Sequence, residues 1–241
     1  MISFPVTIEV YREIERGLWY SQAASTVKGA NGRGVRSGAG IQEQLADSHV
    51  ENYNTLTEKL IKEYLMDIFY GRVGMKSRNV IAYTGEYGML SFDEALKDSS
   101  NSFLTLDTKF ITGEGQNLAF GGQFVRYIGV NGITLTLKHN PIYDDQEVNR
   151  IYHTELQTPI ESNRFTFFDF DNGRGGDNIK MVKKKDGFSH AYVVGLSGPA
   201  GPIKGGMSAN SKDGFDMIVK DQCGLHIDDI TRCGELILNA T

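Results

Sequence analysis

The stretch SHVENYNTLTEKLIKEYLMDIFYGRVG, residues 48–74, carries the strongest structural signal in the chain. Ser48 and Glu51 form an S-x-x-E capping box, and Gly71 and Gly74 mark an end. This pattern predicts one amphipathic helix of about 23 residues and ~35 Å, which is long for a globular domain. The predicted buried stripe recurs with helical spacing at Tyr53, Leu56, Leu60, Tyr64, Leu65, Ile68 and Phe69.

The sequence that follows this helix is rich in predicted strands and tight turns. Ser91 and Glu94 predict a short capped helix from Phe92 to Lys97. Asn131-Gly132 between two β-rich runs predicts a hairpin with a two-residue turn. The other strands are predicted at NVIAY (79–83), FTFFDF (165–170), IKMV (179–182), FSHAYVVG (188–195), FDMIVK (215–220) and ELIL (235–238).

The first forty residues are less regular. Val6, Ile8 and Val10 alternate with polar residues, which favours a strand or a short helix near the N-terminus. Residues 21–40 contain five glycines, three basic residues and no acidic residue. We predict an extended loop in this region, with a hairpin around Asn31-Gly32 as the alternative.

Composition describes a folded, mildly acidic chain. Of its 241 residues 40% are apolar and 23% are charged, with a formal net charge of -5, which excludes an intrinsically disordered protein. No stretch approaches the ~18 consecutive apolar residues that a membrane-spanning helix needs. The two cysteines, Cys223 and Cys233, form no metal or redox pair motif, so we predict two free thiols.

The sequence contains no phosphate-binding, metal-binding or catalytic motif with the required spacing of residues. The glycine-rich segments lack the phosphate-binding pattern, and the five histidines show no metal-ligand spacing. The aspartates of DFDNGRGGD (169–177) resemble a calcium loop, but the pattern fails at Gly173, Arg174 and Lys180, which favours a tight turn. The adjacent carboxylates Asp144-Asp145 and Asp228-Asp229 leave a hydrolase open. We expect a protein that is not an enzyme, with no catalytic residue, metal site or cofactor.

Several segments together resemble the major capsid proteins of tailed bacteriophages, above all those of crAss-like phages. The resemblance begins at GAGIQEQL (38–45) and continues through LMDIFYGRVGMKSRNVIAYTGEYGMLSFDEAL (65–96). The second segment matches the family in five features. These are a basic residue (Arg78), a buried strand (Val80–Tyr83), a T-G turn (Thr84-Gly85), a second glycine (Gly88) and an aromatic residue near a helix start (Phe92). It ends with DNIKMV, YVVGLSGPAGPIKGG and GLHIDDITRCGELIL in the last third of the chain.

The resemblance implies an α+β fold of the Hong Kong 97 type, with a long spine helix, β-hairpins and extended loops. The expected segments are an N-terminal segment with a glycine-rich loop (1–47), a peripheral-domain spine helix (48–75), an axial-type α+β region (76–162) and a C-terminal strand-and-loop region (163–241). Capsid proteins of this group are much longer, so we expect a part of such a protein or a shortened relative.

The resemblance also implies a function and partners. We expect a virion subunit, made in the host bacterial cytoplasm, that self-assembles into hexamers and pentamers of an icosahedral shell around double-stranded DNA. Expected partners are other copies, portal, scaffolding or decoration proteins, and DNA by enclosure, but no membrane. Basic residues Lys28, Arg33 and Arg36 are candidates for the subunit interface. The alternatives are a carbohydrate-binding tail or cell-surface module, and a hydrolase with a carboxylate pair.

Overall fold

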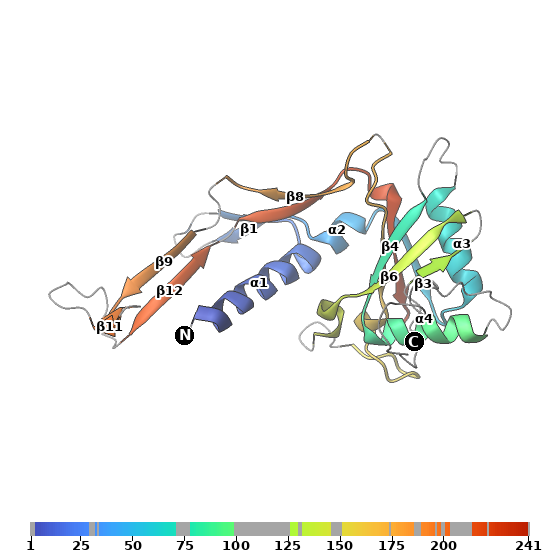
Figure 1. Ribbon diagram of the computed structural model, residues 1–241, viewed down its shortest axis with the longest axis horizontal. Helices are drawn as coiled ribbons and strands as arrows, with labels where there is room; N and C mark the ends of the chain where they lie inside the picture. The colour runs from blue at the N-terminus through green and yellow to red at the C-terminus, as the bar shows by residue number, and fades with distance from the viewer. Residues whose placement is uncertain are drawn as a thin grey trace, which may run out of the picture. The chain divides into compact units, whose positions relative to one another are not determined.

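The computed structural model divides the chain into two compact units, each built from segments distant in sequence (Figure 1). Unit 1 comprises Met1–Gly40 and Lys180–His226, and unit 2 comprises Ile41–Ile179 and Ile227–Thr241. The structure describes residues 3–28, 32, 34–70, 78–98, 126–129, 132–145, 151–173, 175–185, 189–195, 197–198, 201–202, 214–220 and 222–240.

Unit 2 is organised around a six-stranded mixed sheet with the strand order β3-β14-β7-β4-β6-β5. The pairs β3–β14 and β4–β6 are parallel, and the other neighbours are antiparallel. The sheet therefore joins strands that lie far apart in the sequence. Its strands are β3 (His49–Tyr53), β4 (Asn79–Thr84), β5 (Arg126–Ile128), β6 (Thr134–His139), β7 (Phe165–Phe168) and β14 (Cys233–Leu238).

The first face of this sheet carries the hydrophobic core. The register pairs Ala82 with Phe167 and Phe165 with Leu236, so these alternate apolar side chains share one face. Helices α3 (Glu58–Phe69) and α4 (Glu86–Asp98) bury their apolar sides in the same cluster. The ring of Tyr64 from α3 lies 4.9 Å from that of Phe167, centroid to centroid. Burial of this face supplies the main stabilisation of unit 2.

In the described part of unit 2, three short 3-10 turns lie beside the sheet, and the first of them reaches its second face, where the Tyr143 hydroxyl lies 2.5 Å from Thr166 Oγ1. These are η2 (Pro141–Asp144), η3 (Glu161–Asn163) and η4 (Ile230–Arg232). Tyr143 of η2 is completely buried, and β7 is buried along its whole length. Strand β7 is therefore covered on both faces, which explains why its sequence, FTFF, is continuously apolar apart from one threonine.

Unit 1 is built from a helix and two-stranded ribbons. Helix α1 (Ser3–Tyr20) is followed by α2 (Ile41–Leu45) only after the chain has entered unit 2. The ribbons pair β1 (Ala24–Lys28) with β2 (Gly34–Ser37), β9 (Ser189–Val194) with β12 (Phe215–Lys220), β10 (Ser197–Gly198) with β11 (Gly201–Pro202), and β8 (Ile179–Lys183) with β13 (Cys223–Ile227). Such ribbons are marginally stable alone.

Most predicted strands are confirmed, the hairpin predicted around Asn131-Gly132 is present, and residues 21–40 form the alternative hairpin instead of the extended loop that was predicted. Strands β4, β7, β8, β9, β12 and β14 lie at the predicted positions. The ribbon β1–β2 is the hairpin that was the alternative to a loop in residues 21–40, and Gly32 has a positive φ of 72°. The N-terminal segment is an 18-residue helix, so its early alternation of apolar residues did not indicate a strand.

The prediction of one helix starting at Ser48 is wrong. Residues 49–53 form strand β3, and α3 starts at Glu58, where the hydroxyl of Thr57 accepts the Leu60 N–H. The Ser48 hydroxyl instead donates to the carbonyl of Ile230. Strand β3 pairs with β14, which lies about 180 residues later, and this non-local pairing overrides the local helical pattern. The resulting α3 has 12 residues.

Two further predictions need correction. Helix α4 begins at Glu86, not near Ser91, and the Ser91 hydroxyl donates to Asn163 Oδ1 instead of capping the helix. In the β5–β6 hairpin the Gly129 N–H donates to the Ile133 carbonyl, so three residues connect these partners instead of two. Gly132 has a φ of 72°, which suits the last position of a three-residue loop.

Candidate functional site

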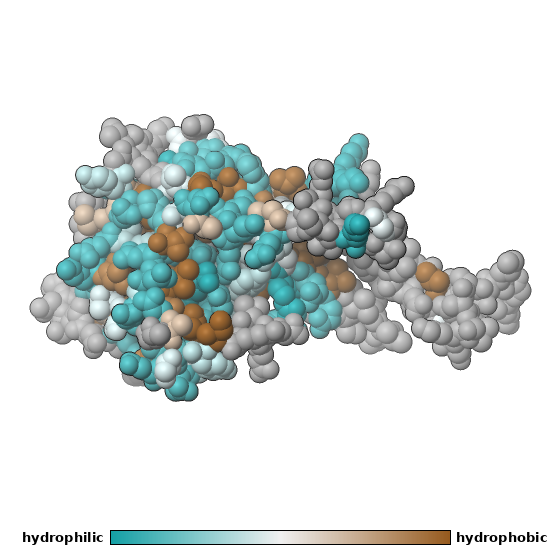
Figure 2. Space-filling view, turned by 180° about the vertical axis from the view of Figure 1, so that it is seen from behind, coloured by the Kyte–Doolittle hydropathy of each residue, from teal (hydrophilic) through white to brown (hydrophobic). Residues whose placement is uncertain are grey.

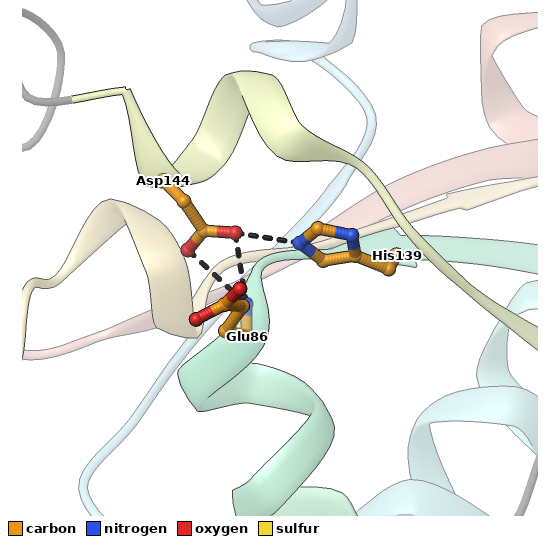
Figure 3. A group of neighbouring side chains, drawn as sticks. All are labelled: Glu86, His139 and Asp144. Atoms are coloured by element: carbon orange, nitrogen blue, oxygen red, sulfur yellow. Dashed lines mark hydrogen bonds and ion pairs between the residues drawn. The ribbon is translucent and has the colours of Figure 1, made fainter.

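Three elements of unit 2 bring two carboxylates and an imidazole together (Figure 3). Glu86 lies in the first turn of α4, His139 ends β6, and Asp144 ends the 3-10 turn η2. One ligand-type atom from each side chain lies within 4.8 Å of the other two. Asp144 Oδ2 is 2.7 Å from His139 Nε2. In the described part of the chain this is the group of chemically active side chains that most resembles a site.

The hydrogen bonds around Asp144 identify it as the N-terminal cap of α4. The Glu86 N–H donates to both carboxylate oxygens, at 3.1 and 3.0 Å. The Ser162 hydroxyl donates to Oδ1 at 2.5 Å. A Cβ on Gly85 would lie 2.6 Å from both Asp144 Oδ1 and Ser162 Oγ, so the close approach requires glycine at position 85. The carboxylate therefore lies on the N–H groups and positive dipole end of the helix.

The same geometry argues against a cation at this cluster. An imidazole nitrogen and carboxylate oxygens are common ligands of divalent metals. However, both oxygens of Asp144 already accept hydrogen bonds, and a helix N-terminus disfavours positive charge. Glu86 and His139 are also exposed to solvent. The arrangement supports a structural anchor between α4 and η2 more directly than it supports metal binding.

Sequence reasoning missed this cluster. His139 and Asp144 are five residues apart and separated by Pro141, so their closeness could have been suspected from a turn. Glu86 is 58 residues from Asp144, and no local signal links them. The other carboxylate pair also has a structural use, because Asp229 Oδ1 accepts both the N–H and the hydroxyl of Thr231. Neither pair thus gains support as a hydrolytic site.

Removing the Asp144 carboxylate should loosen the start of α4. We expect Asp144→Ala to lower the free energy of unfolding by about 1–2 kcal/mol, because a helix cap is lost. Asp144→Asn keeps an acceptor for the Glu86 N–H and should lose less. Urea unfolding followed by circular dichroism measures both values, and equal stability of the alanine variant and the unmodified chain would contradict the capping role.

A second polar group is buried on the second face of the sheet. Arg164 Nη1 lies 2.9 Å from Glu235 Oε2, and Arg164 Nη2 lies 2.7 Å from Glu161 Oε1. The other carboxylate oxygen of Glu235 accepts the Thr166 hydroxyl at 3.1 Å, and Thr166 Oγ1 lies 2.5 Å from the Tyr143 hydroxyl. Glu235 and Thr166 face each other across β14 and β7. We call these five residues the buried ion network.

Burial and charge act in opposite directions within the buried ion network. Burial raises the pKa of Glu235, while Arg164 and the Thr166 hydroxyl oppose that shift. Burial also disfavours the charge on Arg164, but the carboxylates of Glu235 and Glu161 raise its pKa overall. The network therefore holds a carboxylate whose charge depends on its arginine partner. Such a group fixes the register of neighbouring elements and does not by itself provide catalysis.

A third group fixes the turn after β7. Arg232, almost fully buried, has its Nη1 3.0 Å from Asp169 Oδ2. The Asp171 side chain accepts the Gly173 N–H at 2.8 Å, and Asp171 forms a bridge with Asp177. This confirms the predicted tight turn in DFDNGRGGD. Arg232 thus ties that turn to η4.

The residues predicted for the subunit interface lie in unit 1. Lys28 ends β1 and is exposed, and the backbone of Arg36 lies in β2. Arg33 lies outside the described residues. Both cysteines are free thiols, as predicted. Cys223 is partly exposed and Cys233 is buried. Among the described helices, none is long and apolar enough to cross a membrane.

Comparison with known proteins gives two findings. The whole chain, residues 1–241, matches the family described as crassvirus major capsid protein. A segment of 135 residues is 32% identical to the major capsid protein of Bacteroides phage crAss001. That match covers 52% of this chain and 27% of the relative. The chain thus matches little more than a quarter of the length of this curated relative.

Proposed function

This chain belongs to the crassvirus major capsid protein family, and from that membership we propose that it is a structural subunit of a phage capsid. The observation that carries the proposal is the family match over all 241 residues. In this role the protein supplies a surface for assembly and does not catalyse a reaction. Its buried ion network and the Asp144 cap then serve to hold the subunit in one shape.

The mixed α+β architecture is compatible with a capsid subunit, and we extend it to the Hong Kong 97 type. In this proposal α3 occupies the place of the spine helix within segment 48–75, although it begins at Glu58. Segment 76–162 supplies the axial-type region, and segments 1–47 and 163–241 supply the N-terminal and C-terminal parts. The two-stranded ribbons of unit 1 suit a shell, because neighbouring copies can stabilise elements that are marginal alone.

The proposed assembly is an icosahedral shell of hexamers and pentamers in the virion, enclosing double-stranded DNA without reading its sequence. Its partners are other copies of the subunit, together with portal, scaffolding or decoration proteins. The net charge of -5 favours enclosure of DNA over tight binding to it. Assembly takes place in the cytoplasm of the bacterial host.

Electron microscopy of the expressed full gene product tests this function. We expect shells, sheets or ring-shaped capsomers in negative stain, since a capsid subunit binds further copies of itself. Discrete monomers at high protein concentration would overturn the proposal. A variant with an unfolded core, described in the Discussion, controls for aggregation, because aggregates lack a regular repeat.

We also propose that the basic segment from Lys28 to Arg36 contacts a neighbouring subunit. Trypsin should cut this segment in the free subunit and leave it intact after assembly, because an interface excludes the protease. Mass spectrometry of the cleavage products measures the protection. Equal cleavage in the free and assembled states would remove Lys28, Arg33 and Arg36 from the interface.

A further inference from the structure

The two units carry opposite net charge. Unit 1 contains 12 Lys and Arg against 7 Asp and Glu, a net charge of +5. Unit 2 contains 13 Lys and Arg against 23 Asp and Glu, a net charge of -10. The mildly acidic total of the chain therefore conceals a strongly polarised distribution. Opposite potentials on two surfaces of one molecule favour contacts between unlike surfaces of different copies.

A third of the basic residues of unit 1 lie in or directly after one exposed strand. Lys180, Lys183, Lys184 and Lys185 lie in or directly after β8, and all four are exposed. Between them Met181 and Val182 are 51% and 57% exposed. Strand β8 pairs only with β13 among the described strands. We call Lys180–Lys185 the basic ribbon, a surface in which lysines flank large apolar side chains.

Unit 2 presents a surface of the complementary kind. The outer side of α3 and the residue directly after the helix carry four side chains at helical spacing: Glu63, Met66, Asp67 and Tyr70. All four are exposed, Met66 by 42% and Tyr70 by 85%. Apolar side chains are again placed between charges, here of negative sign. Figure 2 shows that hydrophobic residues interrupt the largely hydrophilic surface of this unit.

Strand β3 adds a further carboxylate to this surface. The register with β14 places Glu51 on the same side of the sheet as Tyr53 and the helices. Glu51 is exposed, and it lies opposite Leu236 in the register, a residue whose side chain lies in the core. We call Glu51, Glu63 and Asp67, with Met66 and Tyr70, the acidic patch.

The existing partners of the acidic patch leave it available for a stronger contact. Lys59 lies 3.7 Å from Glu63, but both side chains are highly exposed, and such pairs contribute little. His49 Nδ1 lies 2.8 Å from Asp67 Oδ2, and the aspartate is still 64% exposed. Strand β3 is also the edge of the six-stranded sheet. An exposed edge beside exposed charge is where a further strand can dock.

We propose that the basic ribbon of one copy docks on the acidic patch of a second copy, in a head-to-tail contact. This inference rests on the proposed function and names a contact through which the shell would be built. The contact joins two different surfaces, so it leaves an unused surface on each side and can be repeated through many copies. Side chains alternate along β8, so Met181 and Lys183 share one face. In the proposed contact Met181 meets Met66 and Tyr70, while Lys183 and the lysines that follow the strand meet the carboxylates.

A charge-exchange experiment on the full gene product tests the contact. Variant A carries Lys183→Glu, Lys184→Glu and Lys185→Glu, and variant B carries Glu63→Lys and Asp67→Lys. Each reverses one surface, so each alone should raise the concentration needed for assembly by at least about tenfold. An equal mixture of A and B should assemble again, because the ribbon of each variant then finds an opposite charge on the other. Light scattering and negative stain measure assembly.

Control variants separate the contact from general charge effects. Lys138→Glu and Glu155→Lys alter exposed charges of unit 2 outside the acidic patch and should assemble normally. Circular dichroism should give each variant the spectrum of the unmodified protein. If variant B fails to fold, two other measurements test the contact. Variant A should still assemble poorly, and added salt should weaken assembly of the unmodified protein, because salt screens the attraction between the two surfaces.

The outcomes distinguish this inference from the proposed function. If A and B assemble like the unmodified protein, the contact is wrong while the capsid function stands. If a chain carrying all five substitutions assembles but the mixture of A and B does not, the two surfaces meet within one chain, which also overturns the inference. If the unmodified protein stays monomeric at every concentration, both the function and the contact fail.

Discussion

Replacing Arg164 with methionine should destabilise the protein by about 3–5 kcal/mol at neutral pH, because it leaves a buried carboxylate without its cation. Glu235 is 3% exposed, and its partner Arg164 Nη1 lies 2.9 Å away. Methionine fills much of the volume of the arginine stem without supplying charge. Thr166 would then be the remaining described hydrogen-bond donor to Glu235.

The pH dependence of this variant follows from Glu235. Burial already raises the pKa of Glu235 in the unmodified chain, and loss of Arg164 removes the charge that opposes the rise. An acid whose pKa is higher in the folded state stabilises folding at low pH, and this contribution is lost as the pH rises. The deficit of Arg164→Met should therefore shrink as the pH is lowered from neutral towards the ordinary pKa of glutamate, about 4.3.

A double variant isolates the effect. Arg164→Met with Glu235→Leu removes both charges and should recover most of the lost stability, since apolar replacement of a buried pair is often neutral. The difference between the single and double variants, measured by urea unfolding at several pH values, reports on Glu235 alone. A single variant as stable as the unmodified chain at neutral pH would show that the pair does not hold the second face.

Leu65→Asp should prevent unit 2 from folding in soluble form. Leu65 is 1% exposed and lies on the buried side of α3 within the core. An aspartate there would place a charge in an apolar environment without a partner, a cost that approaches the whole stability of a typical domain, about 5–15 kcal/mol. Leu60 is a weaker choice, because it is only partly buried.

The adjacent residue provides the control. Met66 lies on the same helix and is 42% exposed, so Met66→Asp should fold normally. Soluble yield and the circular dichroism spectrum of the two variants measure the difference. A folded Leu65→Asp protein, or an unfolded Met66→Asp protein, would show that the buried side of α3 has been assigned incorrectly.

Local pattern predicted most of the strands and the second half of the long helix, which is α3, but it could not predict contacts between distant segments. HVENY (49–53) fits both a helical stripe and an alternating strand. What decides is the parallel pairing with Cys233–Leu238, which no short-range signal reveals. The start of α4 was missed for the same reason, because its cap, Asp144, comes from another element.

The sites show the same division between local and distant information. The tight turn at DFDNGRGGD was predictable from its own residues, whereas Arg232, which holds it, comes from η4. The buried ion network brings together Tyr143, Glu161, Arg164, Thr166 and Glu235 through the sheet and its turns. Opposite unit charges were hidden for a further reason: unit 1 is assembled from two separate stretches of sequence.

The most direct test of this account is a cryo-electron microscopy map of particles formed by the full gene product. We expect a closed shell whose repeating density contains the sheet β3-β14-β7-β4-β6-β5 with α3 and α4 on one face. Neighbouring repeats in this shell should be copies of the same chain that contact one another directly. A shell built from another polypeptide, or a product that forms no particle, would contradict it.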